Sequence, residues 1–163
     1  MRLFGVVGWK NSGKTGLVER LVTEFAGRGL TVSTIKHAHH AVDVDQSGTD
    51  SFRHRAAGAS QVLLASSTRW ALMTELRGAE EPGLEALLAQ LSPVDLVLVE
   101  GFKRAGHPKI EAHRGVTRQG LLADSDPTIR AVASDSVPAT DRPVLHLDDT
   151  QAIADFIATE VGP

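Results

Sequence analysis

The stretch that decides the fold reads Gly8-Trp9-Lys10-Asn11-Ser12-Gly13-Lys14-Thr15. It matches G-x-x-x-x-G-K-[ST], the pattern of phosphate-binding loops (P-loops) in nucleoside triphosphatases. Residues 2–8 form a short β-branched and apolar run, and apolar side chains recur at helical spacing from residue 13 onward. The loop is therefore predicted between a strand and a helix, where free backbone N–H groups and the positive end of the helix dipole attract a phosphate.

This loop supplies most of the predicted nucleotide contacts. Its glycines let the backbone wrap closely around a phosphate, the Lys14 ammonium reaches the β- and γ-phosphate oxygens, and the Thr15 hydroxyl binds Mg²⁺. A glycine-rich turn with exposed lysines is the alternative interpretation. The predicted nucleotide-binding residues of this segment are Gly8, Trp9, Lys10, Asn11, Ser12, Gly13, Lys14, Thr15 and Gly16.

A second ligand for magnesium is expected at one end of the apolar run over residues 94–99. Asp95 and Glu100 stand at the two ends of this predicted buried strand, roughly 16 Å apart at about 3.3 Å per residue. In open parallel sheets, ligands bind beyond the carboxyl ends of the strands. Glu100 is therefore predicted to hold Mg²⁺, directly or through water, unless it only begins a loop. Asp95 is expected to face solvent or to cap a helix.

The remaining pattern indicates a single α/β domain over residues 1–163. Strand and helix signals alternate, which favours a mostly parallel sheet, and two β-prone stretches separated by a short polar turn favour an antiparallel hairpin. The helix that starts near residue 13 is expected to end at about residue 27, and the last helix is expected to be capped by Asp149 or Thr150. The other elements expected are strands over 30–35, 60–65, 69–76, 110–112, 129–133 and 144–147, and helices over 49–57, 83–91 and 150–161.

A polar segment rich in His and Asp, residues 36–45, follows the second predicted strand and should open at the same sheet edge as the P-loop. We expect it to order around the γ-phosphate. Its histidines, His37, His39 and His40, together with His54, are also compatible with a zinc site, although no regular ligand spacing is evident.

The predicted short helix over 49–57 presents Asp50, Arg53 and His54 on one face. Asp50 is predicted to bind magnesium-bound or attacking water, which makes it a candidate catalytic residue together with Lys14 and Glu100. A simple ion pair within the helix explains the same spacing.

Composition excludes several other classes of protein. The 163 residues are 42% hydrophobic and 23% charged, with no cysteine and a formal net charge of −3. These values argue against disorder, disulfide frameworks and thiolate zinc sites, and against a broad basic face for nucleic acid or membrane. No apolar run approaches the roughly 18 residues of a membrane span. We expect a cytoplasmic protein without nucleic-acid or membrane partners.

Four segments taken together resemble one known family, the molybdopterin-guanine dinucleotide biosynthesis protein B family (MobB). The resemblance runs in matching order from the first strand to about residue 114. Its segments are the P-loop, the His/Asp segment with Asp43 and Asp45, the stretch over 48–59 and the run Val99-Glu100-Gly101-Phe102-Lys103.

The resemblance implies a three-layer P-loop NTPase fold with a projecting hairpin, formed here by residues 60–76. It further implies GTP and Mg²⁺ as ligands, weak GTPase activity, and assistance to the guanylyltransferase (MobA) that attaches GMP to molybdopterin. Homodimers, and contacts with molybdopterin or molybdoenzymes, are implied as well. One departure concerns the second loop position, where related P-loop proteins often carry a lysine and this chain has Trp9.

Guanine recognition and the type of reaction are the points left open. The usual N/T-K-x-D motif is absent, and Asp135 after a predicted strand is the candidate for guanine, or a surface residue of a loop. One alternative function is an ATP-dependent small-molecule kinase, for which Arg114, Arg118 and Arg130 would supply lid arginines. Another is a non-catalytic adaptor that nucleotide gates. Lys103 and Arg104 are candidates for contacts with phosphates or a partner.

Overall fold

The computed structural model describes residues 1–38 and 43–162, and the chain divides into two compact units. The first unit consists of Met1–His37 and Leu84–Pro163, and the second of Ala38–Gly83. Within the described residues, no helix combines the length and the apolar character that crossing a membrane requires.

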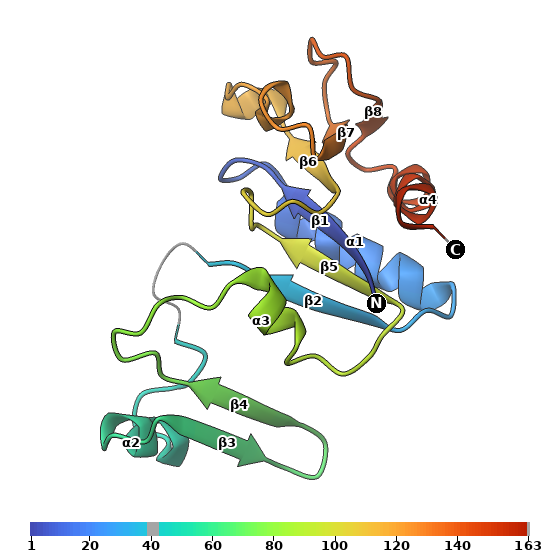
Figure 1. Cartoon of the computed structure of the whole chain (residues 1–163). Helices are drawn as coiled ribbons and strands as arrows, with labels where there is room; N and C mark the ends of the chain where they lie inside the picture. Colours follow the sequence, from blue (N-terminus) through green and yellow to red (C-terminus); the bar gives the residue numbers. More distant parts are fainter. Residues whose placement is uncertain (39–42, 163) are drawn as a thin grey trace. The chain divides into compact units, whose positions relative to one another are not determined.

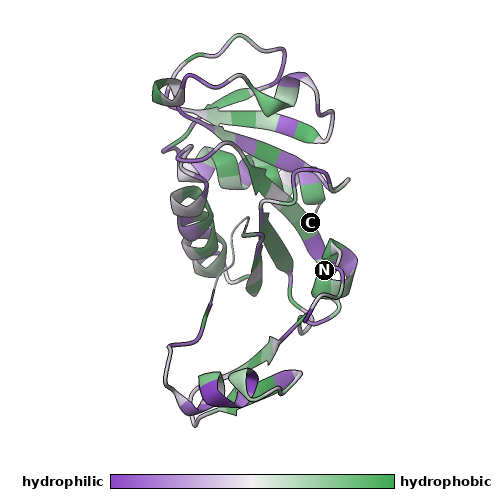
Figure 2. Ribbon diagram, turned by 90° about the vertical axis from the view of Figure 1, so that its left-hand side faces the viewer, coloured by the Kyte–Doolittle hydropathy of each residue, from purple (hydrophilic) through white to green (hydrophobic). Residues whose placement is uncertain are grey.

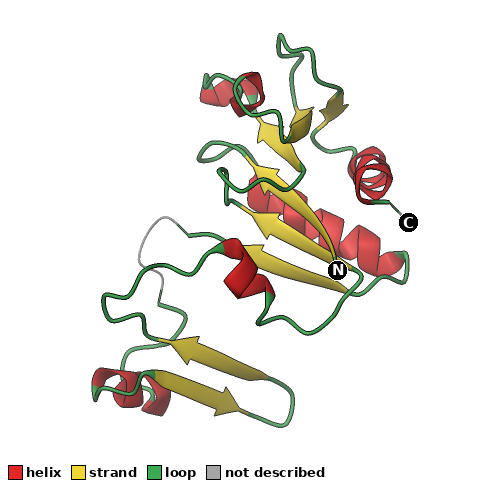
Figure 3. Ribbon diagram, in the orientation of Figure 1, coloured by secondary structure: helices red, strands yellow, loops and turns green. Residues whose placement is uncertain are grey.

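Six strands of the first unit form one sheet (Figures 1 and 3). They are β1 (Arg2–Val7), β2 (Val32–Lys36), β5 (Leu96–Glu100), β6 (Lys109–His113), β7 (Ile129–Ser134) and β8 (Val144–His146). Their order is β2-β5-β1-β6-β7-β8, and every neighbouring pair in it is parallel. The loop after β1 therefore leaves the sheet between the carboxyl ends of β5 and β6.

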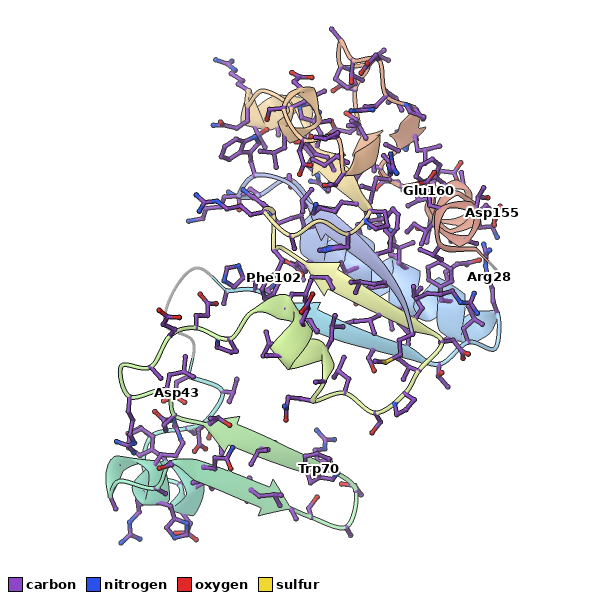
Figure 4. The ribbon with its side chains drawn as sticks, in the orientation of Figure 1. Arg28, Asp43, Trp70, Phe102, Asp155 and Glu160 are labelled. Atoms are coloured by element: carbon purple, nitrogen blue, oxygen red, sulfur yellow. The ribbon has the colours of Figure 1, made fainter. Side chains whose placement is uncertain are left out.

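Two helices, α1 (Lys14–Gly27) and α4 (Thr150–Val161), cover one face of this sheet. An ion pair between Arg28 and Asp155, 2.6 Å long, joins the end of α1 to α4 (Figure 4). Figure 2 shows the hydrophobic colour on the central strands that the helices cover. The largest side chains of this core are Phe4, Leu17, Leu21, Phe25, Leu98, Ile110, Leu147, Ile153 and Ile157.

The opposite face of the sheet carries a shorter element. Successive side chains of a strand point to opposite faces, so Val7 lies on the face away from the core that contains Phe4 and Val6. There the 3₁₀ helix η2 (Leu122–Asp124) packs on the sheet through Ala123. This arrangement completes the predicted three-layer α/β fold. Two further short elements of the unit are α3 (Leu84–Leu88) and η1 (Gly115–Thr117).

The second unit contains α2 (Asp50–Ala56) and an antiparallel hairpin of β3 (Gln61–Ala65) and β4 (Trp70–Thr74). Arg55 ties it together by ion pairs with three carboxylates at 2.7–3.3 Å, which belong to Asp43, Asp45 and Glu75. Burial acts to raise the pKa of both aspartates, but hydrogen bonds from backbone and hydroxyl groups, together with Arg55, hold it below the ordinary value. The hairpin prediction is confirmed.

Asp95 is partly exposed, as expected, but its carboxylate also has a partner within the sheet that the sequence does not predict. The parallel pairing of β2 with β5 places Thr31 beside it. Asp95 Oδ2 accepts hydrogen bonds from the Thr31 N–H at 2.8 Å and the Thr31 hydroxyl at 2.7 Å. These bonds lower the pKa of Asp95. Asp95 therefore fixes the start of β2 at the sheet edge opposite Glu100.

Candidate functional site

The P-loop backbone takes conformations that require glycine at two positions. Gly8 has φ 146° and Gly13 has φ 92°, and both lie in the region that L-residues rarely adopt. A Cβ on Gly8 would also lie 2.4 Å from the Ala112 carbonyl oxygen. The sharp turn from β1 into α1 therefore requires glycine at position 8.

The N-terminus of α1 offers free hydrogen-bond donors. Leu17 N–H makes the first hydrogen bond of the helix, with the Gly13 carbonyl at 3.0 Å. No side chain caps this end, and its first turn contains no acidic residue. The amides at the start of a helix then remain available to an anion. They border an open pocket of about 420 Å³ lined by Asn11, Ser12, Gly13, Lys14, Thr15, Gly16, Arg20, Arg114 and Leu147.

Ser12 provides a second sign that the loop is built around a ligand. The residue is 2% exposed, and its hydroxyl oxygen has no hydrogen-bond partner among the described residues. A buried hydroxyl without a partner costs free energy of about 1–3 kcal/mol. A bound phosphate or water at the loop would satisfy it.

A triangle of contacts marks the candidate magnesium site. The Thr15 hydroxyl donates to Glu100 Oε1 at 2.9 Å, and Lys36 Nζ lies 3.2 Å from each of these two oxygens. The strand register brings them together because Lys36 and Glu100 are direct neighbours on β2 and β5, and Glu100 pairs with Val6 of β1. The structure therefore brings together the two residues predicted to bind Mg²⁺, and their binding of the metal stays a prediction.

This pair of oxygens fits the geometry of a magnesium site. Mg²⁺ holds its octahedral ligands at about 2.0–2.1 Å, so two adjacent ligands lie about 2.9 Å apart. The separation of Thr15 Oγ1 and Glu100 Oε1 is 2.9 Å. Glu100 is also buried, and a buried carboxylate is costly unless it is paired with a cation. Hydroxyl and carboxylate oxygens are hard ligands of the type that Mg²⁺ prefers.

Lys14 lies over the loop that precedes it. Its Nζ donates to the Trp9 carbonyl at 2.6 Å. Burial lowers the pKa of Lys14, Glu100 acts in the opposite direction, and the positive charges of Lys103 and Lys36 lower it further. Lys14 lines the pocket, and Lys36 and Lys103 are close enough to act on its charge, so an anion that binds there relieves their mutual repulsion.

Aromatic side chains border the same region. Lys103 Nζ lies 4.4 Å from the centroid of the Trp9 ring, and the Trp9 indole N–H donates to the Gly120 carbonyl at 2.7 Å. After β5, the Phe102 ring stacks on His37 with centroids 4.6 Å apart (Figure 4). Lys103 thus contacts the P-loop, whereas the Arg104 side chain makes no hydrogen bond or ion pair with the described residues.

The remaining predicted site residues have other surroundings. Asp135 Oδ1 accepts the Gly115 N–H at 2.9 Å, so one of its oxygens supports the loop after β6. Asp50 belongs to the second unit, where it is highly exposed and forms an ion pair of 3.7 Å with Arg53, as the ion-pair alternative anticipates. Its predicted role toward water stays a prediction, as does guanine recognition by Asp135.

The histidine segment is described only in part. His39 and His40 lie outside the described residues, whereas His37 N–H donates to the Glu100 carbonyl at 2.9 Å. Among residues 1–38 and 43–162, no group of three or more His, Asp and Glu side chains is placed to hold a metal ion.

The sequence does not predict three residues of the site, of which Arg20 and Leu147 line the pocket and Lys36 lies beside Thr15 and Glu100. Lys36 was expected in the segment that follows β2, but its contact with Thr15 and Glu100 depends on strand order. Arg20 and Leu147 line the pocket from α1 and from the loop after β8. No sequence motif contains these residues, and they come close to the P-loop only when the chain folds.

Comparisons with known proteins find similar chains over the whole length. The model of the MobB family, "Molybdopterin guanine dinucleotide synthesis protein B", matches residues 3–135. A "molybdopterin-guanine dinucleotide biosynthesis adapter protein" from Haemophilus influenzae is 43% identical over 157 residues, 95% of this chain and 86% of the relative. A protein of the same name from Escherichia coli is 40% identical over 160 residues, which are 95% of this chain and 90% of the relative. The crystal structure of Bacillus subtilis MobB gives a TM-score of 0.75 at 25% identity and covers 99% of each chain.

Proposed function

This chain belongs to the MobB family, and from that premise we propose that it is an adapter protein of molybdopterin guanine dinucleotide biosynthesis that binds GTP with Mg²⁺ and hydrolyses it slowly. The adapter role follows from the names of the relatives. The observation that carries the nucleotide part is the contact of Thr15 with Glu100 beside the uncapped N-terminus of α1.

Each P-loop residue has a defined part in this proposal. The amides at the start of α1 hold the β-phosphate, and Lys14 exchanges its bond to the Trp9 carbonyl for phosphate oxygens. Thr15 and Glu100 hold Mg²⁺, which neutralises charge on the β- and γ-phosphates when it is bound. Lys36, now between these two oxygens, moves toward the γ-phosphate.

Slow turnover is consistent with the bonds that Glu100 makes. Its Oε1 is already engaged by Thr15 and Lys36. A carboxylate that is paired with a cation is a weak base toward water, and fast GTPases use a dedicated glutamine or arginine. Asp50 is our candidate for orienting the water. We expect Asp50→Asn to lower the turnover of bound GTP while the affinity for GTP stays the same.

Guanine selection is assigned to Asp135 as part of the same proposal. Its Oδ1 is held by the Gly115 N–H, which fixes the side chain at the carboxyl end of β7, and the other oxygen is available to accept from guanine N1 and N2. Carboxylate oxygens accept such paired N–H donors well.

The second unit supports the proposal of a homodimer. Four large apolar side chains of its hairpin are 43–68% exposed, namely Leu63, Leu64, Trp70 and Leu72. Val62 is the buried hydrophobic residue among the described residues of this unit. So small a core does not stabilise a unit of this size alone, and exposed apolar patches mark interaction surfaces. We place a second copy there, and MobA, molybdopterin and molybdoenzymes as further partners, in the cytoplasm.

Calorimetry of GTP and ATP binding in the presence of Mg²⁺ tests the proposed function. The parent protein is expected to prefer GTP, and Lys14→Ala is expected to weaken GTP binding at least tenfold because the charge facing the phosphates is lost. Lys10→Ala is the matched control, because Lys10, although predicted among the nucleotide-binding residues of the loop, does not line the phosphate pocket.

The outcomes separate the candidate functions. Unchanged GTP affinity in the Lys14→Ala protein would contradict the site. A preference for ATP would keep the phosphate site but favour the small-molecule kinase. Stimulation of the guanylyltransferase by a Glu100→Gln protein that no longer hydrolyses GTP would indicate a non-catalytic adaptor.

A further inference from the structure

Arg114 lies beside the P-loop on the side of β1 opposite Glu100. The strand order β5-β1-β6 puts Glu100 at the end of β5 and Arg114 directly after β6. The Arg114 Nε lies 3.2 Å from the point that a Cβ on Gly13 would occupy, so the guanidinium rests against the Gly13 backbone. It lines the phosphate pocket together with Gly16 and Leu147.

The two arginines of this pocket differ in their bonds. Arg20 donates to the Leu147 carbonyl at 2.7 Å and to the Thr150 hydroxyl at 3.0 Å, which joins α1 to the start of α4. The Arg114 guanidinium makes no hydrogen bond or ion pair with any residue in the described part of the chain. A guanidinium has five donors in a fixed plane, suited to two oxygens of one phosphate. Arg114 is thus a cation available to a ligand.

The backbone around Arg114 is held in place from three sides. The next residue, Gly115, donates to Asp135 Oδ1 at 2.9 Å, and the Thr117 hydroxyl donates to the Arg114 carbonyl at 2.8 Å. Farther along, the Gly120 carbonyl accepts the Trp9 indole N–H at 2.7 Å. These bonds hold the segment that carries Arg114 against β7 and the P-loop. Because its backbone is already ordered, binding of a phosphate by Arg114 costs little backbone entropy.

A triphosphate on the loop has a defined direction. Thr15, Lys36 and Glu100 mark the end where magnesium and the γ-phosphate belong, on the β5 side. The nucleoside end must then lie on the β6 side. The geometry points to Arg114 as the residue that binds the α-phosphate, the phosphate attached to the nucleoside. This inference rests on the proposed nucleotide function and adds to it the residue that contacts the α-phosphate.

Calorimetry with two ligands tests the role of Arg114. GTP reaches from the magnesium end to Arg114, whereas Mg²⁺-pyrophosphate has two phosphates and occupies the positions beside Lys14 and Thr15. Arg114→Gln is expected to weaken GTP binding at least tenfold and pyrophosphate binding less than twofold, about 1.4 kcal/mol against 0.4 kcal/mol. Arg114→Lys is expected to restore part of the GTP affinity, because it keeps the charge without the planar fork.

Arg118→Gln is the matched control, since it removes a charge from the same segment outside the pocket. Equal GTP affinity in the parent and the Arg114→Gln protein would overturn the inference. Equal weakening of GTP and pyrophosphate would overturn it too, because it indicates a general effect of charge or folding. A parent protein that binds no GTP, or a Lys14→Ala protein that binds it equally well, would instead refute the proposed function, and the inference with it.

Discussion

Thr15 and Glu100 are 85 residues apart in sequence, and the hydrogen bond between their side chains places both beside the P-loop. A threonine in the first turn of a helix and a glutamate at the end of a buried strand are unremarkable in isolation. At 2.9 Å they form a hydrogen bond, and in the proposed function the same two oxygens take adjacent ligand positions on Mg²⁺. Lys36 at 3.2 Å supplies positive charge to the same point in the absence of metal.

Thr15→Val tests the hydroxyl as a magnesium ligand. Valine keeps the shape of threonine but cannot bind a metal, so GTP affinity in Mg²⁺ is expected to fall about tenfold, while affinity in a chelator is expected to change about twofold or less. Thr15→Ser keeps the hydroxyl and serves as the control. Titration calorimetry with and without Mg²⁺ measures both. A tenfold loss that persists in chelator would show that the hydroxyl contacts phosphate instead.

At the scale of elements, Glu111 on β6 connects the sheet to η2. Its carboxylate is fully buried and accepts the N–H groups of Leu122 at 3.0 Å and Ala123 at 2.9 Å. These donors are the orphan amides at the start of a 3₁₀ helix. Burial raises the pKa of Glu111 above its ordinary value, although the two backbone N–H groups act against the shift. η2 therefore depends on a charge that burial disfavours.

Replacing Glu111 is expected to destabilise the first unit. Glu111→Ala leaves two amide donors without their acceptor and should lower the free energy of unfolding by about 2–4 kcal/mol, whereas Glu111→Gln keeps one acceptor and should cost less. Urea unfolding followed by circular dichroism provides the values. A change below about 0.5 kcal/mol in the Ala variant would contradict the anchoring role.

The parent and the Glu111→Gln protein are expected to differ in how their free energy of unfolding depends on pH. Because the pKa of Glu111 is higher in the folded protein than in the unfolded chain, its contribution to stability is complete at low pH and decreases as the pH rises through the folded pKa. Relative to Glu111→Gln, the parent should thus lose free energy of unfolding as the pH is raised from about 4.5 toward neutrality.

At the scale of the whole molecule, the two units differ in how many apolar side chains they bury. The first unit contains the large apolar core under α1 and α4, whereas the described part of the second unit buries Val62 and leaves the hairpin side chains exposed. Within this unit, ion pairs connect Arg55 of α2 to Asp43, Asp45 and Glu75. Polar bonds of this kind add little net stability near the surface, so we expect apolar contacts with a second copy to supply the rest.

Polar replacement of the exposed hairpin residues tests this assembly. A Leu64→Ser, Trp70→Ser double variant is expected to convert a dimer into a monomer in light scattering after gel filtration, since both side chains are more than half exposed. Thr68→Ser at the turn is a mild control. A dimer that survives the double substitution, or a monomeric parent, would contradict the assignment of the hairpin as the interface.

The sequence predicts the parts of the architecture that depend on local patterns. The glycines and lysine of the P-loop, the apolar run before Glu100, and the β-prone stretches on both sides of a polar turn each obey short-range rules, and the structure has the strand, helix and hairpin there. The 3₁₀ helices η1 and η2 carry no periodic signal because each is three residues long. The hydrogen bonds between Asp95 and Thr31 are not predicted, because the two residues are 64 positions apart in sequence.

The sequence by itself therefore determined the P-loop, the parallel α/β class, and Glu100 as the acid at the carboxyl end of its strand. Only the tertiary structure decided that Lys36 stands between Thr15 and Glu100, that Asp95 secures β2, and that Arg114 rests against Gly13. The physical reason is one of range. Backbone preferences and apolar periodicity act over a few residues, whereas these contacts depend on the order β2-β5-β1-β6, which is set by packing of the whole sheet against α1 and α4.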